Sequence, residues 1–228
     1  MNSFKTLFAI LAAAGLVAVV SPAAAQTQVA AATQAQTQEA PDALIKRISH
    51  EVVDAAKADK DIQAGNTKKV LDLVEAKVLP HVNFQRMTQL AAGRFWRDAT
   101  PEQQKQLTAE FRALLVYTYS GAISQIKDQK LEFKPFRAEP TDTEVEVRSQ
   151  VLQPRGEPIQ LNYRLEKTAG GWKIFDVNVL GAWLVETYKG NFAVEIGKGG
   201  IDGLIKALSE KNKRLAASAA KAAQKKAS

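Results

Sequence analysis

The sequence predicts an α+β fold in which helices come first and an antiparallel sheet follows. Apolar residues recur at helical spacing from Asp42 to about Ile126, and from Leu131 onward they alternate with polar residues, as in strands with one wet face. The connections between the expected strands are too short for the crossover that a parallel pair needs. We therefore expect a four-stranded antiparallel sheet packed against several helices.

The N-terminus carries the pattern of an export signal. Lys5 precedes an apolar run from Leu7 to Val20, and Ala23 with Ala25 supplies a small-x-small cleavage site. The run is shorter than the roughly 20 residues that span a bilayer. We predict a signal peptide over residues 1–25, cleaved after Ala25, and a periplasmic location; the alternative is a retained anchor.

Composition narrows the function classes further. The chain has no cysteine, which excludes disulfides and thiolate chemistry. Without residues 1–25, which contain Lys5 and no acidic residue, 30 of the 31 Lys and Arg face 24 Asp and Glu, a formal charge of +6. This balance is compatible with transient contact with an anionic membrane surface or an acidic partner, whereas no nucleic acid is expected outside the cytoplasm. The simpler interpretation is that the net positive charge only keeps the protein soluble.

The first elements are predicted to be a leader and a helical hairpin. Residues 26–41 are mostly Gln, Ala and Thr, too poor in large apolar groups to order, and we expect a flexible leader. One helix should run from Asp42 to about Ala58. Thr67 can cap a second helix, which must end before Pro80.

Two more helices have clear start signals. Asn83 is a candidate cap for a short helix, and Gly93 suits the positive-φ position at its end. Thr100–Gln103 combines a threonine cap, a proline at the first helical position and a glutamine three residues after the cap. A long helix is expected from there to about Ile126.

Four strands should follow. The expected segments are Leu131–Phe136, a strand containing Val145, Val147 and Val151, a strand over residues 159–165, and GWKIFDVNV from Gly171. In the last strand, Phe175, Val177 and Val179 are predicted to share one face, with Trp172 and Ile174 on the other. Gly170 and Gly171 should form the tight turn before it.

The C-terminal part is predicted to be helical. One amphipathic helix should run from Ala182 to about Ile196, and the glycines of segment 197–200 should separate it from a last helix that contains Leu204 and Leu208. The Ala/Lys-rich tail, residues 213–228, suits a frayed helix or a disordered basic tail that could touch anionic lipid.

Residues for catalysis or metal binding are hard to find. His50 and His81 are the only histidines, and neither has the spacing of a triad or a metal motif. Glu144 and Glu146 fall on the wet side of their strand. Asp176 interrupts an apolar strand, and we expect Arg164, Arg148 or a backbone amide to satisfy it as a structural carboxylate. No catalytic or metal residue is predicted.

Five segments of the chain resemble the MlaC family of periplasmic phospholipid-binding proteins of the Mla transport system, also described as a toluene-tolerance family. They are VLPHVNFQRMTQLAAGRFW from Val78, ATPEQQKQLTAEFRALLVYTY from Ala99, GWKIFDVNVLG from Gly171, LVETYKGNF from Leu184 and GGIDGLIKAL from Gly199. The likeness covers about Asp42 to Asn212, so we expect the lipid-binding domain over residues 42–212. At the family's turn after the last strand, Ala182 and Trp183 depart from the pattern.

The resemblance implies a lipid carrier and not an enzyme. It implies a curved sheet and helices that enclose a hydrophobic cavity for phospholipid acyl chains, with phospholipid as cargo and no cofactor. The implied partners are an outer-membrane lipoprotein complex and an inner-membrane ABC transporter complex, between which lipid passes to maintain outer-membrane lipid asymmetry. The residues assigned to lipid binding are Leu115, Tyr119, Val147, Leu161, Tyr163, Phe175, Val177, Val179, Ala182, Trp183 and Tyr188.

The residue pattern alone, without the family resemblance, is compatible with other functions. Apolar periodicity indicates burial, and a dry core of the strands against the long helix would give the same pattern as a cavity. The main alternative is a peptide-binding periplasmic adaptor or chaperone that uses the same groove. A third is an enzyme that acts on lipid or glycan.

Overall fold

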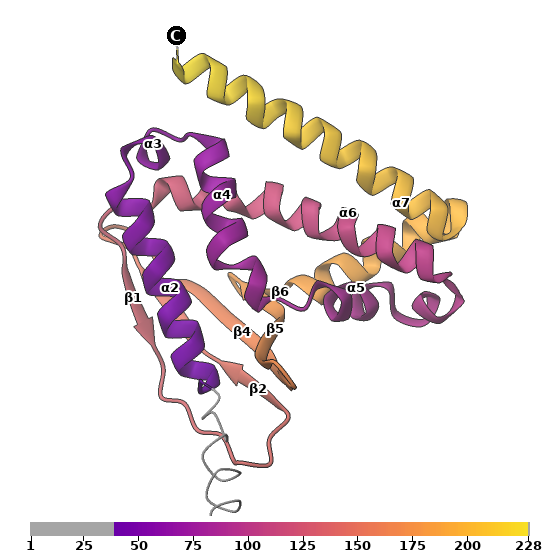
Figure 1. Ribbon diagram of the computed structural model, residues 1–228, viewed down its shortest axis with the longest axis horizontal. Coiled ribbons are helices and arrows are strands. Elements are labelled where there is room, and N and C mark those ends of the chain that lie inside the picture. The colour runs from indigo at the N-terminus through magenta and orange to yellow at the C-terminus, as the bar shows by residue number, and fades with distance from the viewer. Residues whose placement is uncertain (1–38, 228) are drawn as a thin grey trace, which may run out of the picture. The chain divides into compact units, whose positions relative to one another are not determined.

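The structure is a computed structural model that describes residues 39–227, with side chains up to Lys221 (Figure 1). The predicted signal peptide and most of the predicted leader lie outside the described residues. The order of elements agrees with the predicted α+β fold, because the first helices precede every strand.

The N-terminal helices are α2 (Pro41–Ala58), the short α3 (Lys60–Gln63) and α4 (Thr67–Lys77). Asn66, not Thr67, caps α4: its side-chain oxygen accepts a hydrogen bond from the Lys69 amide at 3.3 Å. Thr67 is already helical, so the extended residue before it takes the cap. The helix ends before Pro80, as predicted.

Helix α5 (Phe84–Ala92) begins at the predicted cap, Asn83, and ends at Gly93, whose φ is +60°. Helix α6 (Pro101–Tyr119) begins with the predicted capping box: Thr100 and Gln103 each accept the other's backbone amide. It is shorter than predicted, because a 3₁₀ segment, η3 (Ser120–Gln125), replaces its last turns. Ser120 and Gly121, which favour a helix weakly, begin this segment.

All strand pairs of the sheet are antiparallel, which confirms the fold class. The sheet has six strand segments instead of four, in the order β1-β3-β4-β5-β6 with β2 also on β4. The strands are β1 (Lys130–Phe133), β2 (Glu144–Val147), β3 (Ser149–Leu152), β4 (Ile159–Thr168), β5 (Gly171–Val179) and β6 (Ala182–Trp183).

Two of the six segments come from one predicted strand. Val147 of β2 lies opposite Tyr163, and Val151 of β3 lies opposite Ile159, so β2 and β3 keep one register on β4 and are separated only at Arg148. The sixth segment, β6, covers the first two residues of the predicted C-terminal helix. That helix therefore begins at Leu184 instead of Ala182.

A bulge in β5 corrects the predicted faces of that strand. Leu165 of β4 pairs with Ile174, but Arg164 pairs with Asp176, so Phe175 is an extra residue in β5. Val177, opposite Tyr163, therefore shares the face of Ile174. Phe175 does not share a face with Val177 and Val179, because one inserted residue shifts the alternation by one position.

Helix α7 (Leu184–Ala227) bends at Gly199 and Gly200, as the glycines predicted, and the predicted tail is helical to Ala227. Beyond the bend the helix runs alongside α6 (Figure 1), where Gln103 bonds Asp202 at 2.8 Å and Asn212 bonds the Glu110 carbonyl at 2.9 Å.

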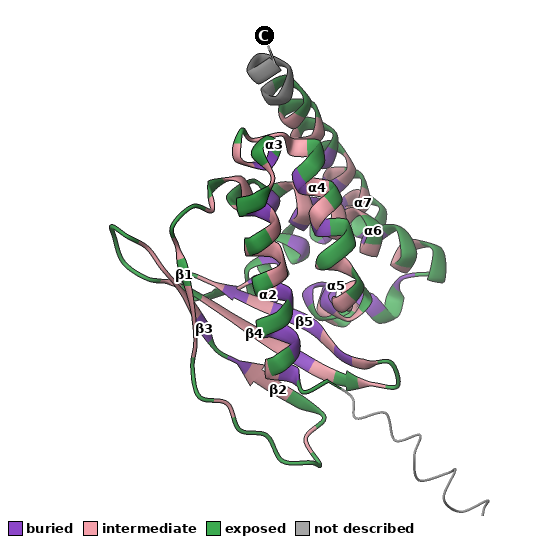
Figure 2. Cartoon of the chain, turned by 60° about the vertical axis from the view of Figure 1, so that its left-hand side comes forward, coloured by how far each residue is buried: buried purple, intermediate pink, exposed green. Residues whose placement is uncertain are grey.

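Two main cores result. In one, α2 packs across the sheet (Figure 2), with Leu44, Ile45 and Ile48 against strand residues. In the other, α5, α6 and α7 surround Phe111 and Phe192, and Phe175 joins them from the sheet.

Candidate functional site

A continuous row of apolar side chains crosses one face of the sheet. Leu131 lies opposite Val151, Val151 opposite Ile159, and Leu161 opposite Val179. Directly opposed residues share a face, as do alternate residues such as Ile159 and Leu161 on one strand. We call these five residues the apolar row.

The row is only partly covered, whereas three residues of the same face that lie under α2 are sealed. Val145, Tyr163 and Val177 on this face are half-buried, like the row. Under α2, Val147, Leu165 and Ile174 are 1%, 0% and 3% exposed. The five members of the apolar row are all half-buried. Each Å² of apolar area that a ligand removes from water stabilises the complex by about 25 cal/mol. An apolar ligand bound to the apolar row would therefore be stabilised by the area that it covers.

Tyr163 lies between the sealed part of the face and the apolar row. Its hydroxyl interacts with Ser49 of α2 and Ser149 of β3, and burial raises the pKa of Tyr163 to about 12. The phenol therefore stays neutral at physiological pH and ties α2 to the sheet beside the row.

Two predicted lipid-binding residues contact arginines instead. The Arg86 guanidinium carbon lies 3.8 Å from the centre of the Phe175 ring, and Arg164 lies 3.8 Å from that of Trp183. Arg86 also forms ion pairs with Glu166 of β4 and Glu144 of β2. These cation–π contacts join α5 to β5 and β6 to β4.

Asp176 has the structural role expected from the sequence. One carboxylate oxygen accepts hydrogen bonds from the amides of Val177 (2.9 Å) and Val185 (3.0 Å), and the other lies 3.4 Å from Arg164. Burial raises the pKa of Asp176, and the two amides and Arg164 oppose that rise. Because Val185 belongs to the first turn of α7, the carboxylate joins β5 to the start of that helix.

The three predicted residues on helices lie together. Tyr188 meets Phe111 edge-on with ring centres 5.0 Å apart, and Leu115 belongs to the same core. Burial raises the pKa of Tyr188 to about 12, and its hydroxyl interacts with Tyr119. Tyr119 is exposed at the end of α6.

Of the remaining predicted residues, Val147, Leu161, Tyr163, Val177, Val179 and Ala182 share the face of the apolar row by strand register. The prediction omitted Leu131, Val151 and Ile159. Their alternation was visible in the sequence, but their place beside Leu161 depends on the pairing of β1, β3 and β4.

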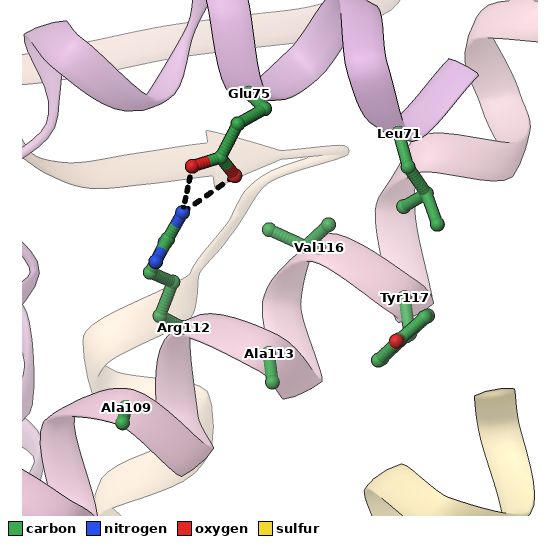
Figure 3. Close-up of a pocket in the computed structure, with 7 residues that line it drawn as sticks. All are labelled: Leu71, Glu75, Ala109, Arg112, Ala113, Val116 and Tyr117. Carbon is green, nitrogen blue, oxygen red and sulfur yellow. Dashed lines mark hydrogen bonds and ion pairs between the residues drawn. The ribbon is translucent and has the colours of Figure 1, made fainter. Parts of the chain in front are cut away.

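Two hollows lie along α6. The first, of about 220 Å³, lies between α4 and α6 (Figure 3), and Glu75 and Arg112 form an ion pair across it. The second, of about 230 Å³, is bordered by Tyr117, η3 and the last part of α7. Both are smaller than the roughly 300–1,000 Å³ typical of ligand pockets. No residue of the apolar row lines either.

Within residues 39–227, no group of three or more His, Asp or Glu side chains could hold a metal ion. In the same part of the chain, no helix is long and apolar enough to cross a membrane.

A solved structure with this fold contains a bound lipid. It is a phospholipid-binding protein from Ralstonia solanacearum in complex with a phospholipid, 47% identical to this chain, with a TM-score of 0.73. The match covers 77% of this chain and 98% of that one.

The family model described as "MlaC protein" matches residues 46–210. The chain belongs to the MlaC family. MlaC relatives include the intermembrane phospholipid transport system binding protein MlaC of Haemophilus influenzae, 26% identical over 66% of this chain and 75% of the relative. The toluene tolerance protein ttg2D of Pseudomonas putida is 25% identical over 71% of this chain and 75% of its own length. The MlaC segment lies within the domain predicted from the sequence, residues 42–212.

Proposed function

We propose that this protein is a periplasmic phospholipid carrier that holds acyl chains against the apolar row. It would pass lipid between an outer-membrane lipoprotein complex and an inner-membrane ABC transporter complex and so maintain outer-membrane lipid asymmetry. The observation that carries the proposal is a partly covered apolar face in a fold whose 47% identical relative contains a phospholipid.

The physical requirement for such a carrier is cover for hydrocarbon. At about 0.8 kcal/mol per methylene, a sixteen-carbon chain costs on the order of 12 kcal/mol to expose to water. A carrier must offer apolar walls without charge. The apolar row meets this requirement, because the polar neighbours Gln150, Gln160 and Asn162 alternate to the opposite face.

The proposed wall is drawn from strands and helices. Tyr163, Val177 and Ala182 extend the apolar row on the sheet, and Leu115, Tyr119 and Tyr188 supply the helical side. Val147 is left out, because α2 seals it. We leave Phe175 and Trp183 out of the wall, because a guanidinium lies on each ring. We propose that residues 1–25 direct export, that residues 26–41 form a leader and that the carrier catalyses no reaction.

The first test is the lipid content of the protein. The full chain is expressed in bacteria with its export signal. The mature protein, residues 26–228, is then purified without detergent, extracted with organic solvent and analysed by mass spectrometry. Stoichiometric phospholipid is expected. Protein that carries no lipid and cannot be loaded from vesicles would contradict the proposal, and bound peptide would favour an adaptor or chaperone.

A second test places a charge on the wall. Val179→Glu should lower the bound phospholipid at least tenfold, because a carboxylate cannot be buried against hydrocarbon without a partner. Ala182→Glu should act in the same direction at a more exposed position. Val194→Glu, on the exposed side of α7, is the matched control and should keep its lipid. If Val179→Glu and Ala182→Glu fold normally by circular dichroism and carry as much lipid as wild type, the assigned wall is wrong.

A further inference from the structure

The turn between β5 and β6 has an unusual residue at its tip. Val179 pairs with Ala182, so Leu180 and Gly181 form a two-residue loop, with φ of +54° and +87°. Positive φ at both positions is the pattern of a type I′ turn, for which Asn-Gly is strongly preferred. Within residues 39–227, Leu180 is the only residue other than glycine with positive φ.

Leucine is a poor choice for this position by two independent criteria. Its side chain is disfavoured in the left-handed region by contact between the β-carbon and the backbone. It is also 69% exposed, the most exposed large apolar side chain among the residues described. Asparagine or glycine would avoid both the strain and the exposure, and backbone strain that persists in a fold points to a functional constraint.

The tip stands at one end of the apolar row. Val179, the last member of the row, directly precedes Leu180, and Ala182 opposite it continues the same face. The Leu180 amide donates to the Gln160 carbonyl at 3.1 Å, and the Gly181 amide donates to the Asn178 side chain at 3.0 Å. These two hydrogen bonds fix the tip, so the leucine is held in water by an ordered turn.

We infer that Leu180 contacts the acyl chains of phospholipid as they enter and leave the apolar row. The inference rests on the proposed carrier function and adds a residue for the transfer step. Leu180 directly follows Val179, so an acyl chain that leaves the row at this end passes the turn. Each methylene that Leu180 covers there lowers the barrier to transfer.

The experiment separates the transfer rate from the amount of lipid bound. The exported protein is loaded with fluorescent phosphatidylglycerol and mixed with unlabelled vesicles of phosphatidylethanolamine and phosphatidylglycerol, and the transfer rate is followed by fluorescence. Leu180→Asn should slow transfer at least about fivefold. The lipid bound at equilibrium should stay within a factor of two of wild type, and the melting temperature should not fall, because asparagine suits the turn.

Three variants complete the design. Leu180→Met keeps an apolar side chain and should transfer at close to the wild-type rate. Val194→Asn removes another apolar side chain, 58% exposed on α7, and should leave the rate unchanged. Leu180→Gly suits the same turn and replaces Leu180→Asn if that variant does not fold.

Wild-type transfer by Leu180→Asn, or equal slowing by Leu180→Met, overturns this inference and leaves the carrier proposal intact as long as the lipid is bound. If the wild-type protein takes up no phospholipid, the carrier proposal itself is contradicted.

Discussion

At the scale of single residues, Asp176 shows how a carboxylate can belong to an apolar strand. The sequence marks it as an exception in KIFDVNV and predicts a partner, and the structure supplies Arg164 and two backbone amides. The Val185 amide is in the first turn of α7, where helix amides lack partners within the helix. The carboxylate therefore has a structural role, and its titration should affect stability.

Asp176→Asn tests this role through pH. Burial raises the pKa of Asp176 in the folded protein above its ordinary value of 3.8. The folded state then binds the proton more tightly than the unfolded state, so this linkage stabilises the protein at low pH and is lost as pH rises through the folded-state pKa. The free energy of unfolding of wild type, relative to that of Asp176→Asn, should decrease as pH rises from the ordinary value of 3.8 through the raised folded-state pKa. Urea titrations at a series of pH values would measure it. A constant or rising difference would contradict the assigned direction.

At the scale of elements, the non-helical Gly199 and Gly200 divide α7 into two helical parts, and both parts pack against α6. Residues before Gly199 reach Phe111 of α6 through Tyr188 and Phe192, and residues after Gly200 lie along α6 from Gln103 onward. Gly200 has φ +66° and ψ −166°, a region that is essentially restricted to glycine. The two glycines predicted the break, but not the direction in which the chain returns.

Gly200→Ala should destabilise the protein by about 1–3 kcal/mol, because a β-carbon strains this backbone conformation. No atom lies within 4 Å of the position a β-carbon would take, so a steric clash does not add to the cost. Gly197→Ala is the matched control: Gly197 is helical, its added β-carbon is equally free, and alanine should stabilise by about 0.5–1 kcal/mol. Thermal unfolding of both variants checks the signs, and equal effects would show that the bend is not strained.

At the scale of the whole molecule, one face of the sheet is covered unevenly. Helix α2 seals Val147, Leu165 and Ile174, while the apolar row stays half-buried. A dry core of the strands against α6, the alternative left open by the sequence, would be expected to seal the row as well. A bound apolar cargo would cover the residues of the apolar row that α2 leaves half-buried.

Removal of the cargo should therefore lower stability. A ligand present at 100 times its dissociation constant stabilises by about 2.7 kcal/mol, which for a chain of this size corresponds to about 5–10 °C in melting temperature. Protein refolded after organic extraction should melt lower by this amount, and reloading from phospholipid vesicles should restore the original value. Identical melting temperatures with and without lipid would argue against cargo on the row.

The sequence alone determined the features that depend on neighbouring residues. The capping box at Thr100, the glycine that ends α5, the break in α7 and the alternation of the strands are local, so their residues carry the information. Tertiary structure decided which strands pair and which face of the sheet each side chain occupies, because local sequence patterns do not encode either. The bulge at Phe175 moved Val177 to the face of Ile174, because one inserted residue reverses every later side chain. Strand pairing joined Leu131, Val151 and Ile159 to Leu161, because the composition of the face of a sheet depends on which strands lie side by side.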